Sequence, residues 1–355
     1  MKIKSQQVFF GAGLRFSLEE KLILADRMKA LIVSTSGQHQ NVSDISINIG
    51  ARFVGAYSNA TLHTPIHVTF DAIKVAENLK ADCIISVGGG AAVGLGKALA
   101  YRTGLMHIAV PTTYAGSECT PILGETIDNL KSTKTHKEIL PDIVIYDPEL
   151  LVTLPIDISV TSGINAIAHA VEALYARNRT ESSTKLAMTG IKHLVDALPN
   201  VVINPRSLKF REQTLRGAWA CGKVLGQVEM ALHHKLCPTI GGLLNLHHSK
   251  THAIILPHAV AYNEPFVGNC LMPVAELLDH SHASRGLWEF ANSLGAPNAL
   301  KTMGVTEFDL IKISEVVLYN PYWNPARIRQ VPLRQLLYNA LEGSSPSAIH
   351  GDSYG

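Results

Sequence analysis

The chain is poor in charge, and the few charges that it has nearly cancel. Only 17% of its 355 residues are Asp, Glu, Lys or Arg, and the formal net charge is +2. A large excess of one sign is what polyanion-binding and membrane-surface proteins carry. We therefore expect neither a nucleic acid nor a membrane as partner.

Cysteines are few and apolar runs are short. Five cysteines are an odd number, and their spacing is not that of a disulfide framework, which is typical of reduced thiols in the cytosol. They are Cys83, Cys119, Cys221, Cys237 and Cys270. No stretch of about 18 uninterrupted apolar residues appears, and no charged segment followed by an apolar run opens the chain. We expect a cytoplasmic protein.

Apolar residues are plentiful in total, at 46%, and a chain of this length can bury a sizeable core in two domains. Up to residue 155, short apolar runs alternate with amphipathic segments that have helical periodicity. The runs read as strands over 28–34, 51–55, 82–87, 107–111 and 143–146, with helices over 65–80 and 92–101. This alternation predicts a Rossmann-like α/β domain with a mostly parallel sheet.

Beyond residue 155 the pattern becomes helical throughout. Helices are expected over 160–178, 181–197, 208–234 and 249–265, and on to about residue 342. We therefore predict an α/β domain over 1–155 and an all-α domain over 156–355.

A glycine-rich segment follows the predicted strand that ends at Val87. Gly88, Gly89, Gly90 and Ala91 then open a helix. Small residues let backbone N–H groups approach a pyrophosphate, and the helix N-terminus adds a favourable partial charge. The segment is not a GxGxxG fingerprint, so a tight turn that binds nothing is the alternative.

A second polar loop, PTTYAGSE over residues 111–118, also follows a strand. Its hydroxyls could contact a nucleotide or cap the next helix. Because open α/β sheets bind ligands at the carboxyl ends of their strands, the two loops together favour a dinucleotide. Ser36 and Gly37 follow the strand 28–34 without an acid to claim the ribose 2′-hydroxyl, which predicts use of both NADH and NADPH.

Four side chains on two segments form the candidate chemical site of the helical domain. Asn165 and His169 are four residues apart, so on a helix they share one face. His234 and His248 follow on a second segment. An Asp at position 165 would complete a plausible divalent-metal site, but an amide is a poor ligand and lacks the negative charge. We therefore expect a site that works without a metal, with histidines as donors and proton carriers.

The remaining histidines of this stretch are assigned lesser parts. His233, His247 and His252 are interpreted as bystanders, and His258 as a packed or partnered residue of a helix.

Together these motifs resemble the iron-containing (group III) alcohol dehydrogenase superfamily, and within it the branch that reduces maleylacetate. The resemblance spans about residues 8–342 and includes GGG after a strand, PTTYAGSE, NAIAHAVEALYA, HHKLC and NPYWNP. It implies the dehydroquinate synthase-like architecture, an α/β dinucleotide-binding domain followed by a helical catalytic domain. It further implies NAD(P)H-dependent reduction of the C=C bond of maleylacetate to 3-oxoadipate in aromatic catabolism, and a homodimer.

The resemblance also implies roles for individual residues. The pyrophosphate would lie against Gly88, Gly89, Gly90 and Ala91; the nucleotide would contact Thr112, Thr113, Ser117 and Lys131; and the substrate cavity would be lined by Asn165, His169, His234 and His248.

One position departs from the family pattern. Members commonly read HHKLCH, whereas this chain has Pro238 in place of the last histidine. Proline cannot titrate and would bend or end a helix there. Two alternatives therefore stay open. One is a metal-dependent alcohol or glycerol-type dehydrogenase using His169, His234 and His248, and the other is a nucleotide-binding homologue with weakened catalysis.

Overall fold

The computed structural model describes residues 5–127 and 130–347. It divides into two compact units, one made of residues 1–154 and 205–216, the other of residues 155–204 and 217–355. The predicted fold class, a mostly parallel α/β domain followed by a helical one, is confirmed. Segment 205–216, which the sequence predicts to be part of the helical domain, groups with the α/β unit. There the buried guanidinium of Arg211 donates to the Tyr114 hydroxyl and to the Leu154 carbonyl.

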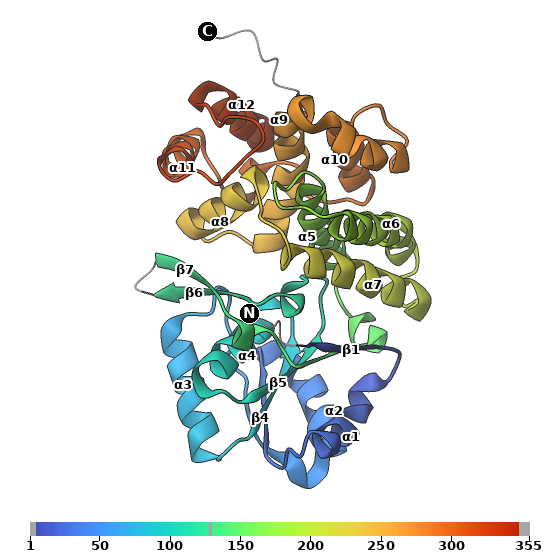
Figure 1. The fold of residues 1–355 in the computed structure, drawn as a ribbon, viewed down its shortest axis with the longest axis vertical. Coiled ribbons are helices and arrows are strands. Elements are labelled where there is room, and N and C mark those ends of the chain that lie inside the picture. Colours follow the sequence, from blue (N-terminus) through green and yellow to red (C-terminus); the bar gives the residue numbers. More distant parts are fainter. Residues whose placement is uncertain (1–4, 128–129, 348–355) are drawn as a thin grey trace. The chain divides into compact units, whose positions relative to one another are not determined.

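The α/β unit is built on a six-stranded sheet in the order β1-β8-β5-β4-β2-β3 (Figure 1). Every neighbouring pair is parallel. The central strands β2 and β4 are buried at every residue, which suits a sheet covered on both faces. The strands are β1 Gln7–Phe10, β2 Ala30–Ser34, β3 Phe53–Tyr57, β4 Cys83–Gly88, β5 Met106–Pro111 and β8 Ile143–Tyr146.

Helices cover both faces of this sheet. In Figure 1, α1 (Leu18–Leu24) and α2 (His39–Ile49) lie on the side opposite α3 (Ile66–Asn78). The core on the α3 and α4 (Gly90–Thr103) side includes Leu31, Ile84, Leu95 and Leu99. An antiparallel hairpin of β6 (Ile122–Ile127) and β7 (Leu130–Thr135) completes the unit.

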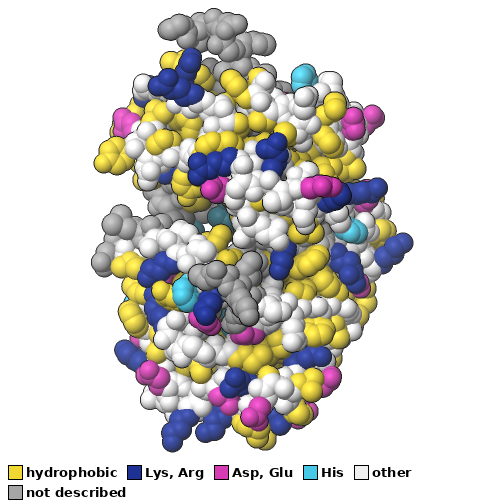
Figure 2. All heavy atoms as spheres, in the orientation of Figure 1, with side chains coloured by type: hydrophobic (Ala, Val, Ile, Leu, Met, Phe, Trp, Pro, Cys, Tyr) yellow, Lys and Arg dark blue, Asp and Glu magenta, His cyan; other side chains and the backbone are white. Residues whose placement is uncertain are grey.

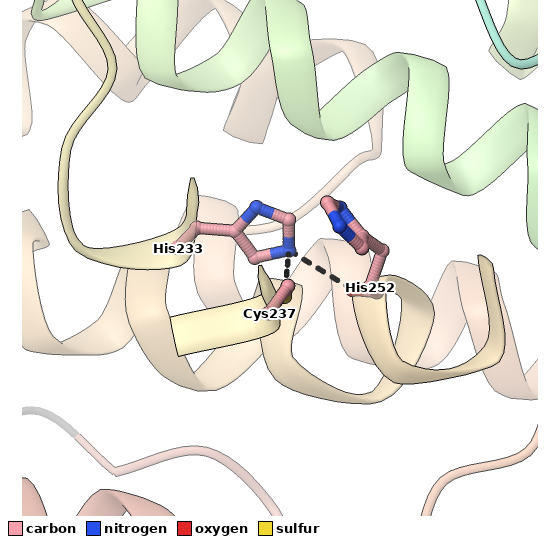
Figure 3. Close-up of side chains that lie close together, drawn as sticks. All are labelled: His233, Cys237 and His252. Atoms are coloured by element: carbon pink, nitrogen blue, oxygen red, sulfur yellow. Dashed lines mark hydrogen bonds between the residues drawn. The ribbon is translucent and has the colours of Figure 1, made fainter. Parts of the chain in front are cut away.

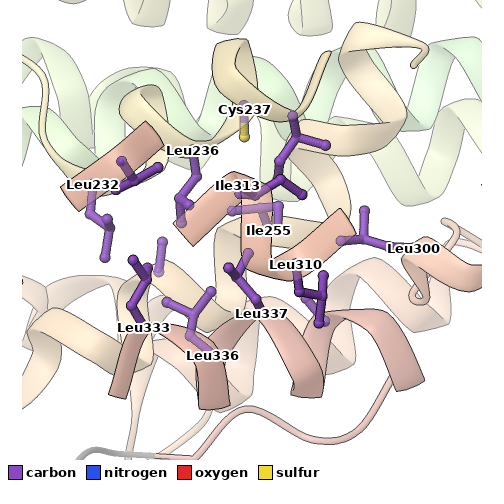
Figure 4. Packing of buried hydrophobic residues seen from close by; sticks show 14 of the residues in the cluster. Leu232, Leu236, Cys237, Ile255, Leu300, Leu310, Ile313, Leu333, Leu336 and Leu337 are labelled. Carbon is purple, nitrogen blue, oxygen red and sulfur yellow. The ribbon is translucent and has the colours of Figure 1, made fainter. Parts of the chain in front are cut away.

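The second unit is wholly helical within the described residues. Its core gathers Leu232, Leu236, Ile255, Ile313 and Leu337 between four helices (Figure 4). The helices are α5 Ile156–Leu174, α6 Glu181–Ile203, α7 Leu208–Leu225, α8 Leu232–Leu244, α9 His248–Leu277, α10 Ala283–Ser293, α11 Glu307–Tyr319 and α12 Gln330–Glu342. The first nine residues of α7 belong to the α/β unit.

Three expectations about elements are corrected. The predicted helix over 208–234 is wrong, because α7 ends at Leu225 and α8 begins at Leu232. Pro238 does not end a helix, since α8 runs through it to Leu244. The strand expected at 51–55 lies two residues later, where Phe53 to Tyr57 pair with β2.

Charged side chains of both signs are interspersed with apolar ones on the face drawn in Figure 2. Several pairs follow helical spacing, such as Lys185 with Glu181 and Arg216 with Glu212. Such exposed pairs contribute little stability. By length and composition alone, α6 is the single helix of the described chain that could cross a bilayer, and 39% of its best window is buried. Core helices pass the same test, so this evidence is weak.

Candidate active site

The first candidate region lies at the carboxyl ends of β2 and β4, which are neighbours in the sheet. After β2 the chain proceeds to β3 on one side, and after β4 it proceeds to β5 on the other. The loops that follow β2 and β4 therefore diverge. Open α/β sheets bind ligands in the crevice that such diverging loops form. The glycine-rich segment occupies one wall of this crevice.

Two of its glycines are required by close packing. Gly88 has φ +144°, and a Cβ there would lie 2.9 Å from the Ala92 Cβ. A Cβ at Gly89 would lie 2.8 Å from the Thr113 Cγ2. A Cβ at Gly90, by contrast, would meet no atom within 4 Å, so the first turn of α4 is open. Gly89 is the N-cap of α4 and no side chain caps the helix, which leaves its first N–H groups available to a phosphate.

A buried network fixes the loop 111–118 beside this glycine segment. The Lys97 ammonium, on α4, donates to the carbonyl oxygens of Ser117 and Ile122 and to the Thr120 hydroxyl. Burial lowers the pKa of Lys97 to about 7. The Tyr146 hydroxyl donates to the Glu118 carboxylate at 2.6 Å, while burial raises the pKa of that carboxyl.

The structure places the predicted nucleotide residues as follows. Thr112 donates its backbone N–H to the Gly88 carbonyl (3.1 Å), and Thr113 packs on Gly89. Ser117 begins a short 3-10 helix, and its own carbonyl oxygen accepts a hydrogen bond from Lys97. Lys131 lies in β7 opposite Thr126, and its side chain is outside the described part of the structure.

The second candidate region is a histidine cluster in the helical unit, formed by α5, α8 and α9. His169 of α5 lies 5.1 Å from His234 of α8, between ring centroids. His234 lies 5.5 Å from His252 of α9, and the His252 ring lies 4.1 Å from that of His248. Asn165 is one turn before His169 and is 2% exposed. Ring contacts thus join His169 and His234 with the exposed His248 through His252, and Asn165 lies one turn along α5 from them.

Several buried polar atoms of this cluster lack hydrogen-bond partners among the described residues. They are the Asn165 Oδ1, the His169 Nδ1, the His234 Nε2 and both ring nitrogens of His252. Burial, reinforced by the neighbouring histidines, holds the pKa of His169 and of His252 well below the usual range. Both rings are therefore neutral near pH 7. Unpaired buried donors and acceptors cost free energy, so a site that keeps several of them is suited to binding a polar ligand.

Glu172 holds this cluster together from α5. Its Oε2 lies 2.8 Å from the His234 Nδ1 and accepts the Ala231 N–H, while its Oε1 accepts the His233 N–H. Burial opposes the charge of this carboxylate. The bonds from His234 and from the backbone, together with the nearby histidines, nonetheless lower its pKa. Glu172 is therefore an ion that caps the start of α8.

The donor set lacks the carboxylate that would help to hold a divalent metal ion. The ligand atoms of Glu172, His233 and His234 lie within 4.8 Å of one another, as do those of His233, Cys237 and His252 (Figure 3). Both sets are already joined by hydrogen bonds; the His233 Nε2 is 3.1 Å from the His252 carbonyl oxygen and 3.4 Å from the Cys237 Sγ. At the family's ligand positions an ion would meet three imidazoles and an amide, without a carboxylate.

The rings of His233 and His252, which we interpreted as bystanders, both contact the cluster. Their part in the chemistry stays a prediction. His247 instead lies beside Ser249, with its Nδ1 3.3 Å from the hydroxyl. His258 is packed, as expected, at 3% exposure. Spacing contained the missed information: Glu172 follows His169 by three residues and His252 follows His248 by four, so each pair shares a helix face.

Comparison with known proteins identifies the family of both parts of the chain. The model of the iron-containing alcohol dehydrogenases matches residues 5–148, and that of the C-terminal part of the Fe-containing alcohol dehydrogenase family matches residues 159–341. The chain belongs to the iron-containing alcohol dehydrogenase family, whose members are NAD(P)-dependent oxidoreductases. The resemblance seen in the sequence is thus confirmed.

Similar proteins within the family are maleylacetate reductases. The one from a Rhizobium species is 45% identical over 96% of this chain and 97% of its own length. The one from Burkholderia cepacia is 42% identical over the same shares. The crystal structure of maleylacetate reductase from Agrobacterium tumefaciens, 45% identical, superposes with a TM-score of 0.93 and covers 98% of both chains.

Proposed function

We propose that this chain reduces the C=C bond of maleylacetate to give 3-oxoadipate, with NADH or NADPH, in the breakdown of resorcinol-, hydroxyquinol- or chlorophenol-type aromatics. The observation that carries the proposal is the buried cluster of Asn165, His169 and His234, in which neutral donors stand where a metal site needs a carboxylate. Its setting in a chain 45% identical to a maleylacetate reductase supports the same substrate.

The nucleotide would be held at the carboxyl ends of β2 and β4. The open first turn of α4 at Gly90 and Ala91 suits the pyrophosphate, with Thr112, Thr113 and Ser117 beside it. When bound, the nicotinamide supplies the hydride that reduces the alkene carbon β to the ketone. No acid follows β2 before Asp44, so nothing in that loop discriminates against a 2′-phosphate, which supports use of both nucleotides.

The cluster would then stabilise the enolate that forms when the hydride adds to the substrate. Addition to the β carbon places negative charge on the ketone oxygen as an enolate. The neutral rings of His169 and His252 can donate hydrogen bonds to that oxygen, as in an oxyanion hole. Protonation of the α carbon, by a histidine or by water, completes the product.

We further propose that the reaction needs no resident metal. A conjugated enone spreads the developing charge, whereas oxidation of a simple alcohol concentrates it on one oxygen. Asn165, an amide at the family's carboxylate position, supports this because it withdraws the negative charge that a divalent ion needs.

The test is loss of NADH or NADPH absorbance with fresh maleylacetate, each with and without EDTA. We expect turnover with both nucleotides that is indifferent to the chelator. Activity lost to EDTA and restored by a divalent ion would favour the metal-dependent dehydrogenase. Nucleotide binding without turnover would favour a homologue with weakened catalysis and would contradict the assignment as a reductase.

We also propose a homodimer in the cytoplasm. The family resemblance favours the dimer, and the five free cysteines suit a reducing compartment. Light scattering of the purified protein should give twice the mass of the chain.

A further inference from the structure

We propose that Glu172 is a positioning residue of the reductase, which acts by fixing the ring of His234 so that the Nε2 of that ring faces the substrate. The inference rests on the proposed function and assigns a part to a residue that touches neither substrate nor nucleotide. Glu172 is fully buried on α5, three residues after His169, on the face that carries the cluster.

Hydrogen bonding settles which way the His234 ring is held. Two of the groups that contact Glu172 are the backbone N–H groups of Ala231 and His233, which can only donate. The carboxylate is therefore an acceptor, and the His234 Nδ1, 2.8 Å away, supplies the third hydrogen. With Nδ1 so engaged, the Nε2 is left as the buried ring atom with no partner in the described residues. A carboxylate that fixes a histidine tautomer in this way is known from catalytic triads.

Glu172 also fixes the start of α8, the helix that carries the His234 ring. The first N–H groups of a helix have no partners within it, and no side chain of α8 itself caps its start. Glu172 accepts two of these groups, and Asn324 accepts a third, from Leu232 at 3.3 Å. Two distant side chains thus hold one helix end, but only Glu172 also contacts the His234 ring. This difference supplies a matched control.

The experiment compares wild type, Glu172→Gln, His234→Asn and the double variant. In either orientation the amide of Glu172→Gln turns its NH₂ group against a backbone donor, and the His234 ring loses its charged acceptor. We expect kcat to fall about 100-fold or more while KM for NADH stays unchanged. Asn at 234 keeps a donor near the Nδ1 position and lacks the Nε2. In that background Glu172→Gln should change kcat by less than about 3-fold.

Asn324→Ala is the control for a merely structural role. It removes the other cap of α8 without touching His234, and we expect kcat within about 3-fold of wild type. A comparable kcat loss in Asn324→Ala, an additive loss in the double variant, or full activity of Glu172→Gln would each overturn the proposal.

A spectroscopic measurement separates this inference from the proposed function. Imidazole nitrogen shifts of the wild-type protein, assigned with His234→Asn, report which nitrogen of His234 bears hydrogen. We expect Nδ1, whether or not the protein reduces maleylacetate. Hydrogen on the His234 Nε2 alone would refute the positioning role even if Glu172→Gln does not fold. Absence of turnover with Nδ1 protonated would refute the substrate assignment alone.

Discussion

Pro238 lies on α8 one turn beyond His234 and is partly exposed. In an α-helix the residue at this position donates its N–H to the carbonyl oxygen of His234, and proline has no N–H to donate. The helix nevertheless continues because its apolar side chains, among them Leu236 and Ile240, are buried in the core of the helical unit. Packing therefore overrides the local cost of the proline.

Two substitutions at this position separate the helix from the chemistry. Pro238→Ala and Pro238→His both restore the missing N–H, and each should raise the free energy of unfolding by about 1–3 kcal/mol in urea titrations. Only the second adds an imidazole one turn from His234. We expect kcat with maleylacetate to rise about 10-fold in Pro238→His alone. Equal kcat values in the two variants would show that a histidine here contributes nothing to proton transfer.

The residues of the site were predictable only where spacing and chemistry coincide. Asn165 and His169 stood out because four-residue spacing on a helix joins an amide and an imidazole. Glu172 has the same kind of spacing but reads as an ordinary helical acid. Its role depends on Ala231 and His233, about sixty residues away, and no local pattern encodes that contact.

Among the elements, the first turn of α4 offers a test of nucleotide binding. Gly90→Ala places a methyl group where no protein atom lies within 4 Å, so the fold should tolerate it. Alanine in a helix should even add about 0.5–1 kcal/mol of stability. If the pyrophosphate lies there, the methyl group crowds it, and we expect Kd for NADH to rise about 10-fold.

Gly268→Ala is the control for that substitution. Gly268 is an exposed residue of α9 with open space around it, so alanine should stabilise the protein similarly and leave NADH affinity unchanged. Unchanged affinity in both variants would support the alternative in which the glycine segment is a turn that binds nothing.

Elements were predictable where the pattern was strong. The apolar runs of β2, β4, β5 and β8 identify buried parallel strands on their own. The hairpin of β6 and β7 was not predicted, because strands such as LKSTKT are polar and lie outside the six-stranded sheet. The gap between α7 and α8 was also hidden, since residues 226–231 carry no proline to interrupt the helical periodicity.

At the scale of the whole molecule, the free energy of unfolding should depend on pH through His258, a histidine outside the cluster. His258 is buried on α9, and neither ring nitrogen has a partner in the described residues. Burial lowers its pKa to about 4. The unfolded chain takes up a proton near pH 6.5, whereas the folded protein does so only near pH 4. The unfolded state therefore binds more protons within this window, and stability falls as the pH drops through it.

The effect of His258 can be measured by urea unfolding between pH 7 and pH 4. The loss assigned to this residue should be on the order of 3 kcal/mol. His258→Leu cannot titrate, so the curve of unfolding free energy against pH should become flatter by that amount. A variant that keeps the full wild-type slope would show that other groups cause the acid sensitivity.

Because residues 205–216 belong to the α/β unit, they affect the order in which the protein can fold during synthesis on the ribosome. Tyr114 lies in the loop beside the glycine segment, and the guanidinium that anchors its hydroxyl, from Arg211, emerges only after α5 and α6 have been synthesised. Domains commonly fold in order as they leave the ribosome. Here the α/β unit is completed only when residues 205–216 have been synthesised, and these follow α5 and α6 of the helical unit. A message truncated after codon 154 would therefore yield a loop in which the Tyr114 hydroxyl lacks the Arg211 guanidinium.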